Sequence, residues 1–244
     1  MSLPPPGSPS RPASRRFRSV LASVRAHPVA TAAVVVVTVV WLAFSALVAM
    51  PPWAVLFVPL LVAALSVALH IVISRRRAAA GPVSDVRLLT TMAGATMIAL
   101  ILIQVVPYGR DRVQPPVTGE PAWADDQTRA LMVRACYGCH SSEVEYPAYA
   151  SIAPISWMVQ SHVDEGREKV NYSQFATDPG DADESVEVIV EGEMPPGYYT
   201  RFGRHPEAAL TAAETQQLIE GLRATPGLAD DDKDRSGDED EDDD

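Results

Sequence analysis

Two cysteines and a histidine stand together near the middle of the chain, in the run Cys136-Tyr137-Gly138-Cys139-His140. This C-x-x-C-H spacing is the pattern of a covalent haem attachment site. Two thiols three residues apart lie on one face of a helical turn, so both can add to the two vinyl groups of a single porphyrin. The imidazole of His140 then faces the iron. Since the chain has no other cysteine, one covalent haem c accounts for every thiol.

Two other interpretations of the same residues are a dithiol redox pair of the thioredoxin kind and a metal-binding fragment that happens to precede a histidine. A thioredoxin-like pair is expected where a strand meets a helix inside a βαβ unit. The segment before the motif, residues 124–135, has a helical pattern instead, and no parallel-strand pattern surrounds it. The sequence therefore favours the haem site.

The residues around the motif, 122–228, predict an all-α domain large enough to enclose one porphyrin. Asp125 or Asp126 can cap a helix that runs into Cys136, and a second helix is expected over residues 156–168. A third begins at Thr211, where Glu214 completes a T-x-x-E capping box, and ends before the Thr225-Pro226-Gly227 stop. Long loops should connect these helices.

Three apolar runs precede this domain, at residues 29–50, 53–74 and 88–107. Each has about twenty residues without Asp, Glu, Lys or Arg, enough for a helix to cross the roughly 30 Å hydrocarbon layer. The first run is longer than the apolar core of a signal peptide and leads directly into the second. We therefore expect three uncleaved transmembrane helices in a multi-pass membrane protein.

Arginines indicate the orientation of these helices. Five precede the first span and four lie between the second and third, whereas the Pro51-Pro52 turn has no charge; they are Arg11, Arg15, Arg16, Arg18, Arg25, Arg75, Arg76, Arg77 and Arg87. Positive loops stay in the cytoplasm, so the N-terminus, residues 1–28, should be cytoplasmic and the haem domain extracytoplasmic. Covalent haem is generally attached on that side, so two independent signals place the haem domain on the outer face of what we expect to be a bacterial cytoplasmic membrane.

Charge separates the remaining parts of the chain. The net charge of -11 is made of +8 over residues 1–107, -10 over residues 108–229 and -9 over the tail that follows. Residues 108–121 contain Pro115 and Pro116 and should form an extended linker. The tail, residues 229–244, should be disordered because it is acidic and almost without apolar residues. Its charge suits a redox partner with a basic docking surface, and we expect no nucleic-acid partner.

The soluble domain resembles the small haem-binding domain family of c-type cytochromes over nearly its whole length. The resemblance lies in the order and spacing of these segments: Cys136-Tyr137-Gly138-Cys139-His140-Ser141-Ser142, Tyr146-Pro147, Tyr149, Ile152-Ala153-Pro154-Ile155-Ser156-Trp157, Glu165-Gly166-Arg167, Asn171-Tyr172-Ser173, Gly192-Glu193-Met194-Pro195-Pro196-Gly197-Tyr198-Tyr199 and His205-Pro206-Glu207-Ala208. It implies a cytochrome c-like haem domain and does not extend to the membrane segments or the tail.

The sixth iron ligand is expected to be Met194. It precedes the terminal helix, and Pro195 favours an extended backbone that can present a thioether from a loop. His162, on the second predicted helix, is the alternative, and His205 is a weaker one. A gap-filling core methionine is the competing interpretation of Met194.

Other side chains are weaker candidates for contact with the haem or for a second cofactor. Aromatic residues could pack on the porphyrin edge and two arginines could pair with its propionates; these residues are Trp157, Tyr198, Tyr199, Arg201 and Arg204. His27 and His70 could bind a second, b-type haem in the membrane, but His27 lies outside the apolar run and His70 is near the interface.

Together these patterns predict a membrane-anchored monohaem c-type cytochrome that transfers single electrons outside the cytoplasmic membrane. An iron closed by His140 and Met194 favours electron transfer over oxygen or peroxide chemistry, so we expect a carrier rather than an enzyme. A peroxidase or gas sensor with five-coordinate iron is one alternative. An accessory haem subunit of a respiratory or photosynthetic membrane complex is another, since three helices exceed what a tether needs.

Overall fold

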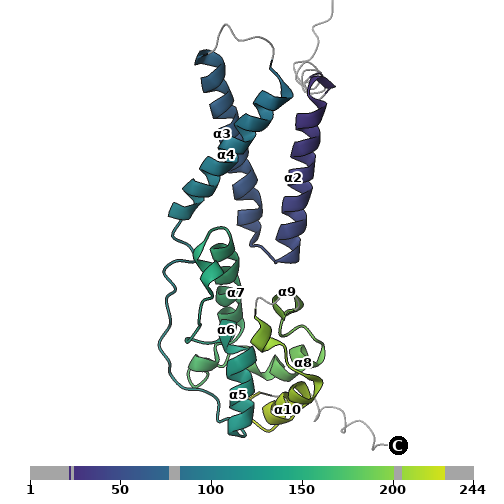
Figure 1. Ribbon diagram of the computed structural model, residues 1–244. Helices are drawn as coiled ribbons and strands as arrows, with labels where there is room; N and C mark the ends of the chain where they lie inside the picture. Colours follow the sequence, from purple (N-terminus) through teal and green to yellow (C-terminus); the bar gives the residue numbers. More distant parts are fainter. Residues whose placement is uncertain (1–21, 23–24, 77–82, 201–204, 229–244) are drawn as a thin grey trace, which may run out of the picture. The chain divides into compact units, whose positions relative to one another are not determined.

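The computed structural model describes residues 22, 25–76, 83–200 and 205–228 (Figure 1). Within them the chain is helical and contains no strand, as the sequence pattern predicts. It forms two compact units, the first with residues up to 46 and 52–105, and the second with residues 47–51 and those from 106 onward. The predictions for Arg11, Arg15, Arg16, Arg18, Arg77, Arg201, Arg204 and the acidic tail lie outside the described residues.

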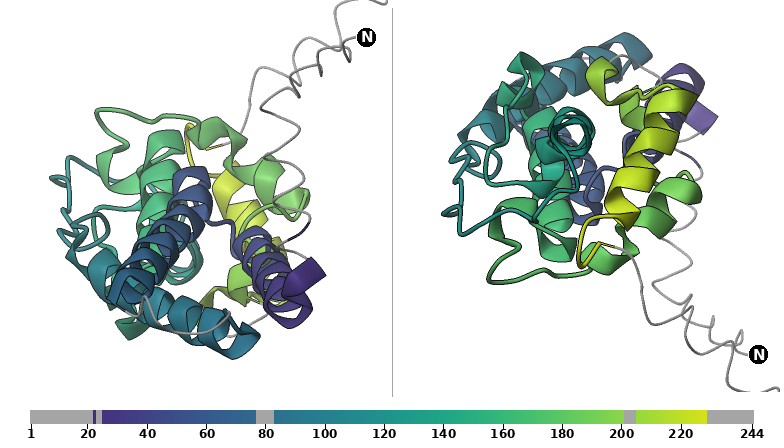
Figure 2. Two further views of the ribbon diagram at one scale, coloured as in Figure 1. Left: turned by 90° about the horizontal axis from the view of Figure 1, so that it is seen from above. Right: turned by 90° about the horizontal axis from the view of Figure 1, so that it is seen from below.

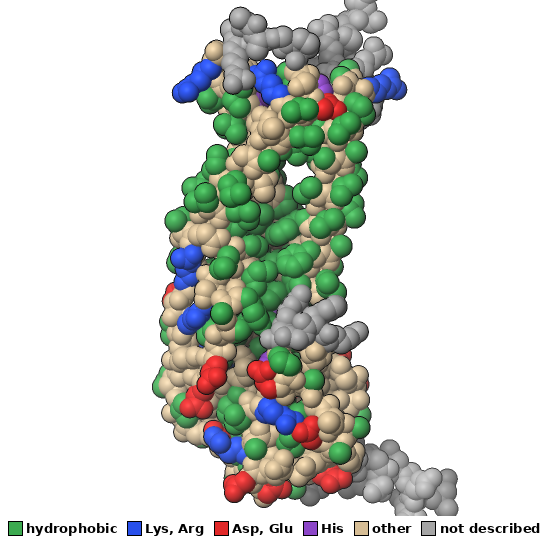
Figure 3. Space-filling view, viewed as in Figure 1, with side chains coloured by type: hydrophobic (Ala, Val, Ile, Leu, Met, Phe, Trp, Pro, Cys, Tyr) green, Lys and Arg blue, Asp and Glu red, His purple; other side chains and the backbone are tan. Residues whose placement is uncertain are grey.

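Three helices make up the first unit: α2 (Pro28–Leu47), α3 (Pro52–Arg76) and α4 (Asp85–Leu102), which a 3-10 turn extends to Val105. All three are long and apolar enough to cross a membrane. Each boundary lies within three residues of its expected position. Apolar side chains cover the visible face of these helices, and arginines gather where α3 ends and α4 begins (Figure 3).

Small residues and two polar contacts join these helices. Ala95 and Ala99 of α4 are fully buried, and α4 packs along α3. The indole Nε1 of Trp41 donates to the carbonyl of Val55 at 3.0 Å, which ties α2 to α3. Asp85, in the first turn of α4, lies 2.8 Å from Nδ1 of His27. A carboxylate there is favoured by the positive end of the helix dipole.

The haem-motif half of the second unit contains α5 (Asp126–Ala135), α6 (Tyr137–His140) and α7 (Ile155–Lys169). Asp125 caps α5 by accepting from Thr128 N at 2.6 Å, as the sequence predicts. The helix expected over residues 156–168 is α7, one residue longer at each end. Helix α6 packs against α7, so α5 and α7 together support the cysteine motif (Figure 1).

The other half contains α8 (Ser185–Val190), α9 (Gly197–Thr200) and α10 (Ala212–Arg223). The capping box of Thr211 and Glu214 is present at the start of α10. Helices α8 and α9 occupy a region expected to be loop. Helix α8 escapes prediction because it is six residues long and has valine at every second position, a pattern more typical of a strand.

Helices α5 and α10 come from opposite ends of the domain and cross in close contact (Figures 1 and 2). A Cβ built on Gly221 of α10 would lie 1.9 Å from Oγ1 of Thr128 on α5, so only glycine permits this approach. The contact buries the core of the domain, which includes Leu131, Met132, Tyr137, Val170, Tyr172, Leu218, Leu222 and Leu228.

Residues 108–121, which we call the strap, belong to the second unit. The expected extended linker is found only in part, because residues 108–110 form a turn in which the Arg110 amide donates to the Pro107 carbonyl at 3.0 Å, and the remainder has no helix or strand. Tyr108 donates to Asp164 Oδ2 at 2.9 Å, and the side-chain amide of Gln114 donates to the Val144 carbonyl at 2.9 Å. Further along, the amides of Thr118 and Gly119 donate to the carbonyl of Ser173. The strap is therefore packed on the haem-motif half of the domain along its length.

Candidate functional site

The cysteine motif forms a single helical turn. Cys136 ends α5, with its amide donating to Met132 O at 2.8 Å, and its own carbonyl then accepts from the amides of Cys139 and His140 at 3.1 and 3.0 Å. The two cysteines are free thiols one turn apart. This is the local geometry in which both thiols can bond to one flat ring.

Both thiols lie in surroundings that disfavour the thiolate. Burial raises the pKa of Cys136 to about 12 and that of Cys139 to about 11. A redox-active dithiol has the opposite property, because its attacking cysteine has a lowered pKa. The described residues also lack the strand that would precede a thioredoxin-like motif. These two observations favour haem attachment over dithiol exchange.

The imidazole of His140 is held by a backbone carbonyl. Its Nδ1 lies 3.2 Å from the oxygen of Val170, and a carbonyl can only accept, so Nδ1 carries the proton. Burial lowers the pKa of His140, which keeps the ring neutral. The Nε2 lone pair is therefore the free one. Metal-binding histidines have this arrangement, with the second ring nitrogen donating to a carbonyl.

Helix α7 and the residues after it hold the motif from the other side. A Cβ on Gly166 would lie 3.1 Å from the Cys139 carbonyl oxygen, so glycine lets α7 approach the motif closely. After α7, the hydroxyl of Ser173 accepts from the amide of Ser142 at 3.0 Å, and the side chain of Asn171 donates to Ser142 Oγ at 3.2 Å. The turn that carries His140 is thus fixed to the segment that supplies the Val170 carbonyl.

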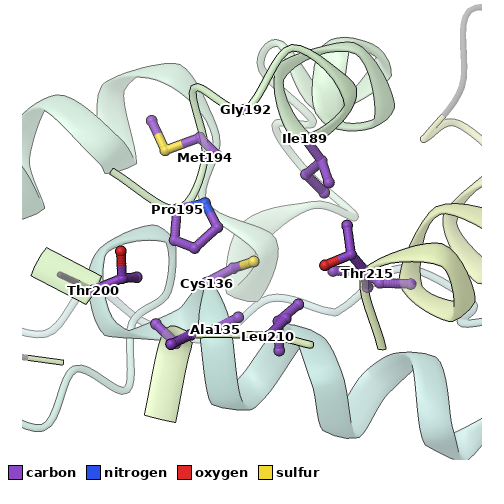
Figure 4. Close-up of a pocket in the computed structure, with 12 residues that line it drawn as sticks. Ala135, Cys136, Ile189, Gly192, Met194, Pro195, Thr200, Leu210 and Thr215 are labelled. Atoms are coloured by element: carbon purple, nitrogen blue, oxygen red, sulfur yellow. The ribbon is translucent and has the colours of Figure 1, made fainter. Parts of the chain in front are cut away.

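A cavity of about 330 Å³ opens beside the motif. Cys136 and Met194 line it from separate segments; in Figure 4 the Cys136 side chain points into the cavity, whereas the Met194 thioether lies beyond the ring of Pro195 and is turned away from Cys136. Its other lining residues are mostly apolar: Ala135, Ile189, Gly192, Thr200, Ala208, Ala209, Leu210, Thr215 and Leu218. This volume is within the range of about 300–1,000 Å³ for small-molecule pockets, and an apolar lining suits a porphyrin face.

Of the two candidate distal ligands, only Met194 lines this cavity. The turn after α8 holds it, because the amides of Glu193 and Met194 both donate to the Val188 carbonyl, at 2.9 and 3.1 Å. Its side chain is 36 % exposed. His162 is buried on α7, with Nδ1 2.8 Å from the Tyr199 hydroxyl and Nε2 2.9 Å from the Ala49 carbonyl.

The weaker candidates lie in other environments. Trp157 is fully buried, and Tyr198 and Tyr199 pack around the ring of His162. His205 pairs with Glu207 at 3.0 Å, and its Nε2 lies beside Gly138. In the first unit, Asp85 contacts His27, and Ser74 contacts His70 at 3.5 Å. No group of three or more His, Cys, Asp or Glu side chains in the described part of the chain could hold a metal ion.

Some residues that support the site have no signal in the sequence. The Val170 carbonyl is a backbone group thirty residues away from His140, so residue types could not reveal it. Gly166, Arg167, Asn171 and Ser173 stood in the segments that carry the family resemblance, but their contacts with residues 139–142 depend on how α7 packs.

The comparison with protein families identifies a haem-binding domain. The model of the haem-binding domain family matches residues 98–224, from the last turns of α4 through α10. No curated protein and no solved structure matches the chain. The match begins before the strap, so the strap and the end of α4 are part of the family's pattern.

Proposed function

Because the chain belongs to the haem-binding domain family, we propose that it is a membrane-anchored monohaem c-type cytochrome that transfers single electrons. One observation carries the proposal. The half-buried, neutral imidazole of His140 donates through Nδ1 to Val170 and leaves Nε2 for iron, directly after two thiols on one helical turn. These residues fit one covalently attached haem.

In this proposal each residue has a separate role. Cys136 and Cys139 would hold the porphyrin through thioether bonds, and His140 would bind the iron through Nε2. The Val170 carbonyl holds the imidazole orientation and increases its basicity. The apolar lining of the cavity excludes water. When bound, the haem supplies the one-electron chemistry, and the protein sets its potential.

Met194 is the proposed distal ligand. Its support is that it shares the cavity with Cys136, whereas both ring nitrogens of His162 have hydrogen-bond partners. A thioether opposite an imidazole raises the reduction potential. It also closes the iron to external ligands, which favours electron transfer over peroxide chemistry or gas binding.

The proposed location is the outer face of a bacterial cytoplasmic membrane, with α2, α3 and α4 in the bilayer. The support is that Arg75, Arg76 and Arg87 gather where α3 ends and α4 begins, since positive loops remain cytoplasmic. The haem domain follows the opposite end of α4. The three spans also suit an accessory subunit of a larger membrane complex, which co-purification in mild detergent would test.

A basic redox partner is proposed to dock at the mouth of the cavity. Exposed Glu191 and Glu193 stand beside Met194 there, and Val190 is 61 % exposed. Opposite charge steers such encounters and is screened by salt. Added salt should therefore slow electron exchange with a basic carrier protein more than with a neutral small reductant, and an equal effect on both would contradict the docking proposal.

Covalent attachment tests the proposal directly. The full chain is expressed in a host that attaches haem to C-x-x-C-H motifs, solubilised in detergent and treated with acid acetone. Haem should stay with the denatured polypeptide, and the Cys136→Ala/Cys139→Ala variant should lose it. The retained haem should titrate as a single one-electron couple. Complete release of haem from the wild type would overturn the proposal.

A further inference from the structure

Arg167 joins three segments of the second unit through one guanidinium. It lies in the last turn of α7 and is half-buried. Its Nε donates to the carbonyl of Ser141 at 2.8 Å, immediately after His140. Its Nη1 donates to the carbonyl of Val113 at 3.0 Å, and its Nη2 donates to the side-chain oxygen of Gln114. The side chain therefore ties the haem motif to the strap.

The charge of this guanidinium is not neutralised by a carboxylate. Its three acceptors are uncharged, and no ion pair found among the described residues includes it. Arg129, Arg134 and Lys169, by contrast, each pair with an acidic side chain. An unpaired cation is unusual in a part of the chain with a net charge of -10.

This charge acts on the haem motif. The Nε of Arg167 donates to the carbonyl of Ser141, the residue that follows His140, so the positive charge lies beside the motif. A charge at that position also acts on a haem held by Cys139 and His140. A nearby cation disfavours ferric iron, which carries one more positive charge than ferrous iron.

We propose that Arg167 is a positioning residue that fastens the strap to the haem motif and raises the reduction potential of the haem. The effect on the reduction potential rests on the proposed haem attachment, whereas the fastening of the strap to the motif does not. Arginine suits both roles because its planar fork presents several donors in fixed directions and stays charged. Lysine would keep the charge but could not reach all three acceptors.

Three variants of the full chain in detergent separate these roles. Arg167→Gln removes the charge, and Arg167→Lys keeps it but loses the fork. Arg112→Gln is the matched control, because Arg112 also holds the strap through uncharged partners, the Ala150 carbonyl at 3.1 Å and Ser151 Oγ at 2.9 Å. Its hydrogen bonds reach Ala150 and Ser151 rather than the motif, and its guanidinium lies 4.9 Å from the ring centroid of Tyr146.

The first readout is redox titration. Arg167→Gln should lower the ferrous-to-ferric ratio at a fixed applied potential about tenfold. For a one-electron couple this corresponds to a fall of about 59 mV in the reduction potential. Arg167→Lys should keep most of the wild-type ratio, and Arg112→Gln should keep all of it. The second readout is hydrogen exchange of the strap, which should become faster in all three variants whether or not haem is bound.

Two results would overturn the proposal. An unchanged potential in Arg167→Gln would exclude the electrostatic role. An equal fall in Arg112→Gln would assign the effect to loosening of the strap rather than to the charge at the motif. If the wild type holds no covalent haem, the proposed function fails. Separately, an unchanged rate of hydrogen exchange in the strap of Arg167→Gln would refute the proposal that Arg167 fastens the strap to the motif.

Discussion

Replacing Gly221 by alanine tests the crossing of α5 and α10, which forms one wall of the cavity beside the cysteine motif through Ala135 and Leu218. The new Cβ would lie 1.9 Å from Oγ1, 2.7 Å from Cγ2 and 2.8 Å from Cβ of Thr128. Rotation of the Thr128 side chain cannot relieve the contact with its Cβ, because this atom does not move when the side chain rotates. Rotation would also break the bond from its hydroxyl to Asp125 at 2.8 Å. The two helices must therefore separate.

Two opposing contributions set the change in the free energy of unfolding of Gly221→Ala. Overpacking of a core costs about 1–3 kcal/mol, and overlap with three atoms places this case near 3 kcal/mol. Alanine gains about 1 kcal/mol over glycine from helix propensity. The net loss in the free energy of unfolding is then about 2 kcal/mol. For a domain of this size that loss lowers the melting temperature by about 10 °C.

Thermal unfolding of the detergent-solubilised haem protein, followed in the Soret band, measures this change. Gln217→Ala is the control, because Gln217 is an exposed position of the same helix. The double variant Thr128→Gly/Gly221→Ala moves the small residue to the other helix, so it should be more stable than the sum of its single changes predicts. If Gly221→Ala instead raises the melting temperature, helix propensity dominates and the close crossing is wrong.

Three further predictions concern the iron, the pH dependence and the topology. Met194→Ala should lower the reduction potential, remove the sulfur-to-ferric charge-transfer band and admit carbon monoxide, while His162→Ala should do none of these; the reverse outcome would make the iron bis-histidine. The pKa of Glu214 is lowered to about 2 by the Thr211 amide and then by Arg134. The stability that the ionised Glu214 carboxylate contributes is therefore present above its unfolded pKa of about 4.3 and is lost as the pH falls toward 2. The free energy of unfolding of Glu214→Gln should therefore fall less steeply than that of the wild type over this pH range. Equal slopes for the two proteins would refute this prediction. Protease added to intact spheroplasts should remove the haem domain, and removal only after permeabilisation would reverse the orientation.

Much of the fold could be predicted because its signals are local. The three long helices follow from apolar runs of about twenty residues, and α10 follows from the capping box of Thr211 and Glu214. Helix α8 could not be predicted, because a six-residue segment has too few turns for its periodicity to separate helix from strand. In the structure this segment packs against α10.

The sequence by itself determined the chemistry available to this protein. The spacing of Cys136, Cys139 and His140 is enough to predict covalent haem attachment, and the structure places these three residues within one helical turn. Family membership rests on sequence as well. Met194 was a candidate from its position before the last helix, but sequence could not place it and Cys136 around one cavity.

Only the tertiary structure decided how these groups are held. The Val170 carbonyl that orients His140, the glycine contacts at Gly166 and Gly221, and the three acceptors of Arg167 all join segments distant in sequence. A backbone carbonyl has no residue type, and a glycine or arginine does not reveal what it will face. Such contacts arise when helices pack at a particular distance and angle, which depends on the fit of many side chains together rather than on any local pattern.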